Sequence, residues 1–115
     1  MWLLASIALV TLQGAGTARS PEWQAWTGCL DAAVRRWAPL AEPAATLVDA
    51  AFVQCERQHD AVLNSMFETL RRSTSSDHAL QQAREIEANT DREMRQVEIA
   101  YILDLRAASL PAPRQ

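Results

Sequence analysis

The chain has 115 residues, a length that fits one domain. Its formal net charge is −3, and its eleven basic residues, all arginines, are interspersed with fourteen acidic residues. Nucleic-acid-binding domains usually carry a basic patch, so we expect no nucleic-acid partner. Glycine is scarce, with three residues in the whole chain, and alanine, leucine, glutamate, glutamine and arginine are frequent. This composition favours helices nearly throughout.

The N-terminus has the pattern of a secretory signal peptide, which we place at residues 1–18. An apolar run extends from Trp2 to Leu12, and Gly16 and Ala18 supply the small residues of a cleavage site. No arginine or lysine precedes the run, and the alternative is a short buried N-terminal helix. The run is shorter than the roughly 20 apolar residues that a spanning helix needs. We therefore expect cleavage, no stable membrane anchor afterwards, and a periplasmic or secreted protein formed by residues 19–115.

The first helix is predicted at about residues 21–38. Ser20, Pro21 and Glu22 provide a hydroxyl cap, a proline in the first turn and an early acidic residue. Apolar residues then recur at helical spacing: Trp23, Trp26, Leu30, Ala33, Val34 and Trp37. Pro39 and Pro43 bracket a short connection, so this helix should fold back along the next one.

A long amphipathic helix is predicted at about residues 43–72, and the rest of the chain must cover its apolar face. The apolar positions follow steps of three and four and include Val48, Ala51, Phe52, Cys55, Val62, Leu63, Met66, Phe67 and Leu70. His59 falls on the same face. Such a helix should measure roughly 45 Å at 1.5 Å per residue.

The two cysteines support this hairpin. Cys29 lies ten residues before Pro39, and Cys55 lies a similar distance into the second helix, so an antiparallel pair places them side by side. In an exported chain we predict a Cys29–Cys55 disulfide. The alternative is a pair of buried thiols in a cytosolic protein.

A third helix is predicted at about residues 77–109, after a polar break that offers Ser76 or Asp77 as its cap. Its expected core face is Leu80, Ala83, Ile86, Thr90, Met94, Val97, Tyr101 and Leu105. The predicted fold class is all-α. The helices form an antiparallel up-down-up three-helix arrangement, with a short first helix, a long helical hairpin and one disulfide.

Two apolar surpluses suggest self-association or a protein partner. The short first helix leaves Leu63 and Phe67 with little cover, and Ile99, Leu103 and Leu110 lie opposite the expected core face of the third helix. A helix that is apolar on two sides expects a second burial partner. The alternative is a monomer with ordinary scattered surface aliphatics.

The sequence carries no recognisable catalytic set. It contains no Gly-x-Ser-x-Gly, no glycine-rich phosphate loop and no CxxCH, and we expect no enzyme activity and no cofactor. Glu56 and His59 form a single Glu-x-x-His, whereas di-metal helical bundles use two such motifs.

A small-ligand or metal site centred on His59 is the alternative function. Glu87, Asp91 and Met94 could approach His59 from the third helix, which allows a single metal ion or a non-covalently bound haem. The competing interpretation is a partly buried histidine that is hydrogen-bonded to Thr90 or to a nearby carboxylate.

Residues 23–56 contain the patterns WxxWxxCLxAAVxxWA and EPAxxLVDAAFxxC. This region resembles small exported helical bacterial proteins of uncharacterised families that carry two cysteines. The resemblance implies a periplasmic setting and assigns no catalytic residue. The apolar surpluses and the absence of a catalytic set favour a non-enzymatic exported protein that acts through protein contacts.

Overall fold

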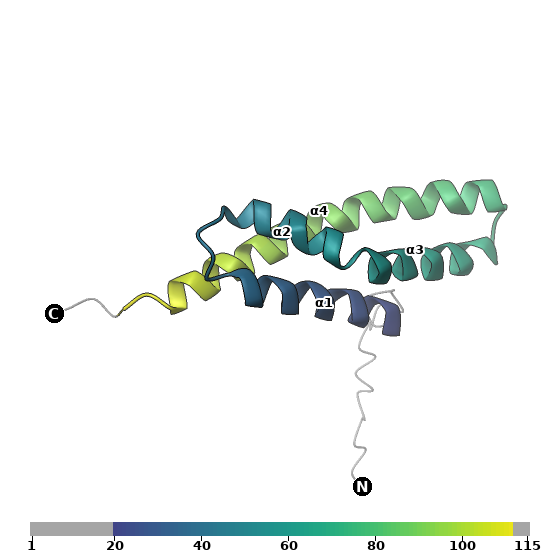
Figure 1. Cartoon of the computed structure of the whole chain (residues 1–115). Helices are drawn as coiled ribbons and strands as arrows, with labels where there is room; N and C mark the ends of the chain where they lie inside the picture. Colours follow the sequence, from purple (N-terminus) through teal and green to yellow (C-terminus); the bar gives the residue numbers. More distant parts are fainter. Residues whose placement is uncertain (1–19, 112–115) are drawn as a thin grey trace, which may run out of the picture.

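The computed structural model describes residues 20–111, and this part of the chain is all-helical (Figure 1). Its four helices are α1 (Pro21–Trp37), α2 (Ala44–Gln54), α3 (Glu56–Arg71) and α4 (Ser76–Ala108). The all-α class and the Cys29–Cys55 disulfide are confirmed. The predicted signal peptide, residues 1–18, lies outside the described residues.

The four helices all pack against one another, and the longest of them, α4, contacts α1, α2 and α3. Figure 1 shows α3 and the first half of α4 projecting together beyond α1, joined at their far end by a tight connection. Among the described helices, none combines the length and apolar character needed to cross a membrane.

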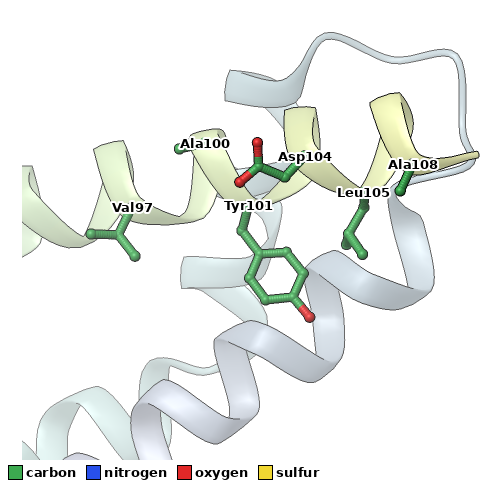
Figure 2. A pocket seen from close by; sticks show the side chains of 6 residues that line it. All are labelled: Val97, Ala100, Tyr101, Asp104, Leu105 and Ala108. Carbon is green, nitrogen blue, oxygen red and sulfur yellow. The ribbon is translucent and has the colours of Figure 1, made fainter.

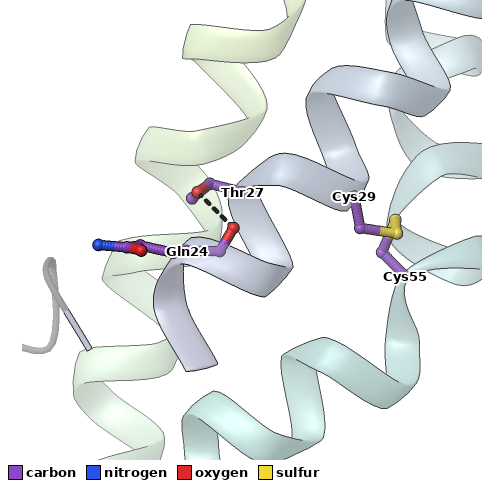
Figure 3. Close-up of a disulfide and its surroundings, with 4 residues drawn as sticks. All are labelled: Gln24, Thr27, Cys29 and Cys55. Carbon is purple, nitrogen blue, oxygen red and sulfur yellow. Dashed lines mark hydrogen bonds between the residues drawn. A yellow bond between two sulfur atoms is a disulfide. The ribbon is translucent and has the colours of Figure 1, made fainter. Parts of the chain in front are cut away.

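The predicted helix over residues 43–72 is interrupted at Cys55, so the structure has two helices where the sequence pattern predicts one. The backbone of Cys55 has φ −98° and ψ 18°, outside the α-helical region. Neither glycine nor proline lies at this point, and the apolar spacing continues across it. Cys55 is fully buried and bonded to Cys29 of α1, with the two Cα atoms 5.9 Å apart (Figure 3). The interruption is therefore a feature of tertiary packing, which overrides local helix propensity.

Serine side chains cap the N-termini of α1 and α4. The backbone N–H of Trp23 donates to Ser20 Oγ at 3.1 Å, so the predicted cap of the first helix is confirmed. For α4 the cap is Ser75, whose Oγ accepts from the N–H of His78 at 3.3 Å. The prediction of Ser76 or Asp77 was wrong by one or two residues, because the helix already begins at Ser76.

Arg106, in the last turn of α4, forms hydrogen bonds with the connection between α1 and α2. Its Nε donates to the carbonyl oxygen of Ala38 at 2.9 Å, and its Nη2 donates to those of Leu40 and Glu42 at 2.7 and 2.6 Å. One guanidinium thus satisfies three carbonyls that the helices leave without partners.

The core lies where α1 crosses α2, α3 and α4. Its largest fully buried side chains are Trp26, Leu30, Val34, Val48, Cys55, Glu98 and Ile102. On α4 the buried positions are Ala79, Ala83, Glu98 and Ile102. The predicted core face of this helix was partly wrong, since Leu80, Ile86 and Val97 are exposed. The apolar pattern pointed to a neighbouring face because the buried face carries small alanines and a glutamate.

Candidate functional site

The five residues predicted as an interaction surface do not form one exposed patch. Leu63, Phe67 and Ile99 are half-buried and pack against the core. Leu103 and Leu110 remain exposed, at 53% and 70%. The first helix covers more of the chain than predicted, because α1 packs against α3 as well as α2.

An exposed apolar strip, called the groove below, lies instead on one side of α4 and is formed by residues of this helix alone (Figure 2). The residues that line it follow one another at alternating steps of three and one and share one side of the helix: Val97, Ala100, Tyr101, Asp104, Leu105 and Ala108. Val97 is 54% exposed. The apolar spacing did not reveal this groove, because it placed Val97 in the core together with Tyr101 and Leu105. The latter two are partly buried and pack against the core, whereas Val97 does not.

Two of the residues that line the groove are polar, Tyr101 and Asp104. The Tyr101 side chain extends toward α1 (Figure 2), where its hydroxyl accepts a hydrogen bond from Arg35 Nε at 3.2 Å. Asp104 is exposed and makes no hydrogen bond or ion pair with the residues that the structure describes. The groove is therefore an apolar strip with one uncompensated carboxylate.

A second candidate site lies between α3 and α4, around His59. His59 Nε2 is 2.8 Å from Asp91 Oδ1, and their side chains are 17% and 27% exposed. Glu87 lies one turn before Asp91 on the same face of α4. One ligand atom from each of His59, Glu87 and Asp91 can be chosen so that all three lie within 4.8 Å of one another.

A small cavity of about 10 Å³ adjoins these three side chains, about the room that one water molecule or one ion needs. Trp26 also lines it, with its ring centroid 4.9 Å from that of His59. Two buried polar atoms of the lining residues have no hydrogen-bond partner: Glu87 Oε2 and the indole nitrogen of Trp26.

The sequence predicted part of this site. His59 and Asp91 are in contact, which matches the interpretation of a histidine bound to a nearby carboxylate. Glu56 is exposed and lies outside the cluster, so the Glu-x-x-His spacing does not describe the site. Met94 packs against the core and does not line the cavity. The cavity has no room for a haem.

Glu98 is a third unusual group, because its side chain is fully buried on α4. Burial raises the pKa of this carboxyl to about 8, and the neighbouring Asp31 carboxyl raises it further in the same direction. A glutamate with such a pKa is largely protonated at neutral pH and serves as a neutral core residue.

Comparison with known proteins found no match, whether among protein-family models, curated proteins or solved structures.

Proposed function

We propose that this chain is an exported, non-enzymatic helical protein that acts by binding an amphipathic helix of another protein. The observation that supports this proposal is the apolar groove on α4, with exposed Val97 at one end and Ala108 at the other. Exposed apolar strips of this kind are typical of protein-binding sites.

The dimensions of the groove fit a helix as the occupant. From Val97 to Ala108 the α4 backbone rises roughly 16 Å at 1.5 Å per residue, which equals about three helical turns. Ala100 and Ala108 are small, so they allow a second helix to approach closely. A partner helix with apolar residues at i, i+3 or i+4, and i+7 would place them against Val97, Tyr101 and Leu105.

The negative charge of the groove indicates that the partner helix carries a basic residue. Asp104 lies inside the strip without an ion-pair partner among the described residues. A lysine or arginine within the apolar face of the partner helix would pair with it. A second copy of this chain is less suitable, because two Asp104 carboxylates on facing α4 helices would repel one another.

Two further observations support export and exclude a cysteine nucleophile. Disulfides persist mainly in oxidising compartments, and the Cys29–Cys55 bond accompanies a signal-like N-terminus. Because both cysteines of the chain are joined, neither is available as a nucleophile.

Photo-crosslinking in the cells that make the protein tests the proposal. A photoreactive phenylalanine analogue replaces Val97 in the groove, and the matched control carries it at Val53, a 72% exposed residue of α2. We expect one dominant adduct from position 97 that maps to an amphipathic helix of another protein, and its loss in Asp104→Arg. An adduct of two copies of this chain, or equal adducts from positions 97 and 53, would contradict the proposal.

A further inference from the structure

We infer that His59, Glu87 and Asp91 bind a single divalent transition-metal ion, with Zn²⁺ as the representative, between α3 and α4. This inference is independent of the helix-binding groove, which lies on the C-terminal part of α4.

The donor set suits such an ion. An imidazole nitrogen and carboxylate oxygens together form a mixed nitrogen and oxygen ligand set, which Zn²⁺ accepts. Mg²⁺ and Ca²⁺ prefer oxygen ligands alone. Two carboxylates also balance the charge of a divalent cation, and three protein ligands leave a fourth position for water.

The side chains are already close to the separations that a metal ion requires. At metal–ligand distances of about 2.0–2.1 Å, the ligand atoms around a tetrahedral Zn²⁺ lie roughly 3.4 Å apart. His59 Nε2 and Asp91 Oδ1 are 2.8 Å apart, and the whole set falls within 4.8 Å. Side-chain displacements of about an ångström would therefore bring these ligand atoms to tetrahedral separations.

The unpartnered buried atoms provide a second, independent argument. The Trp26 side chain is fully buried, lines the same cavity and has an indole N–H without an acceptor, while Glu87 Oε2 has no donor. Buried polar groups without partners are costly and uncommon. A cation would satisfy the Glu87 oxygen, and a water on that cation would provide the acceptor that the Trp26 N–H needs.

A single bridging water is the competing occupant, since the cavity of about 10 Å³ has room for either. The two differ in one measurable respect. A metal ion that joins α3 to α4 stabilises the folded protein by an amount that grows with the logarithm of the metal concentration above the Kd. A protein that holds only water does not respond to added metal.

The test is titration of the metal-free, disulfide-bonded mature protein with ZnCl₂ by calorimetry, together with its melting temperature and tryptophan fluorescence. Both cysteines are oxidised, so no thiol competes for the ion. We expect one Zn²⁺ per chain, a rise in melting temperature, and a change in emission from Trp26, whose ring lies 4.9 Å from His59. Mg²⁺ and Ca²⁺ at the same concentrations should leave all three unchanged.

Three variants separate this site from incidental binding. His59→Gln, Glu87→Gln and Asp91→Asn each remove one ligand with little change of volume, and each should weaken Zn²⁺ binding about tenfold or more. The matched control is His78→Gln, because His78 is the other histidine of the chain and is exposed. Its affinity should equal that of the unmodified protein.

The inference is overturned if Zn²⁺ produces neither heat nor a shift in melting temperature, which would assign the cavity to water. It is equally overturned if Glu87→Gln, with an unchanged circular dichroism spectrum, binds Zn²⁺ as tightly as the unmodified protein. Loss of binding in His78→Gln would place the ion elsewhere and would also contradict it.

Discussion

Cys29 is bonded to Cys55 at the residue where the chain passes from α2 to α3. The disulfide therefore connects the middle of α1 to the interruption between two helices, with Cys55 fully buried (Figure 3). It fixes the point from which α2 and α3 both pack against α1 and α4.

Removing this bond should destabilise the protein strongly. The linked residues are 26 positions apart, and a loop of this size corresponds to roughly 3.5 kcal/mol in the chain-entropy model. We expect reduction, or Cys55→Ser, to lower the melting temperature by more than about 10 °C, measured by circular dichroism. The double variant Cys29→Ser/Cys55→Ser is the control, since added reductant should not change it further. An equal melting temperature in the oxidised and reduced protein would contradict this role.

Replacing Arg106 by lysine should also destabilise the fold, although it preserves the charge. A lysine ammonium cannot reproduce the fork that contacts the carbonyls of Ala38, Leu40 and Glu42. We expect a loss of about 2 kcal/mol in the free energy of unfolding, by urea titration. Arg92→Lys is the matched control, because Arg92 is an exposed residue of the same helix. Equal stability of the two variants would show that the three hydrogen bonds contribute little.

Because of Glu98, the free energy of unfolding should fall as the pH rises from about 4.5 to 8. Its pKa is raised to about 8 by burial and by Asp31, so between about pH 4.5 and 8 the folded state binds more protons than the unfolded state. Its contribution to stability is therefore complete below about pH 4.5 and is lost as the pH rises through 8. The loss amounts to at most a few kcal/mol, since each pKa unit corresponds to about 1.4 kcal/mol.

The matched variant Glu98→Gln isolates this effect. Its amide keeps the shape of the side chain but cannot ionise, so the free energy of unfolding of the unmodified protein should fall relative to that of Glu98→Gln between pH 5 and 8. Urea titrations at several pH values measure this difference. A difference that stays constant over this range would mean that Glu98 does not titrate as described.

Helix positions and the disulfide followed from local signals in the sequence. Ser20, Pro21 and the prolines at 39 and 43 mark where α1 begins and ends, and the cysteine spacing predicted the bond that the structure contains. The interruption at Cys55 has no such signal, since no glycine or proline accompanies it. It coincides with the burial of Cys55 and with its bond to α1, which are features of the folded chain and not of the local sequence.

The candidate sites were less predictable because they depend on which face of α4 is buried, that is, on the orientation of this helix about its own axis. Apolar periodicity correctly assigned Ala83 to the core, and Tyr101 packs against it, but Val97 is exposed and the protonatable Glu98 is fully buried instead. A buried glutamate counts as polar in any pattern of hydrophobicity, so this part of the buried face was assigned incorrectly. The same orientation determines that the groove is exposed and that Glu87 and Asp91 face His59.

The most direct test of the proposed function reverses the charge of Asp104 and then reverses the charge of its basic partner residue. The partner helix is the one identified by crosslinking from position 97. The affinity of the purified protein for this helix is measured by calorimetry, first with Asp104→Arg and then with the opposite change at the basic residue of the helix. We expect the first change to weaken binding at least about tenfold and the second to restore it. Binding that is unaffected by Asp104→Arg would contradict a groove that recognises its partner through this carboxylate.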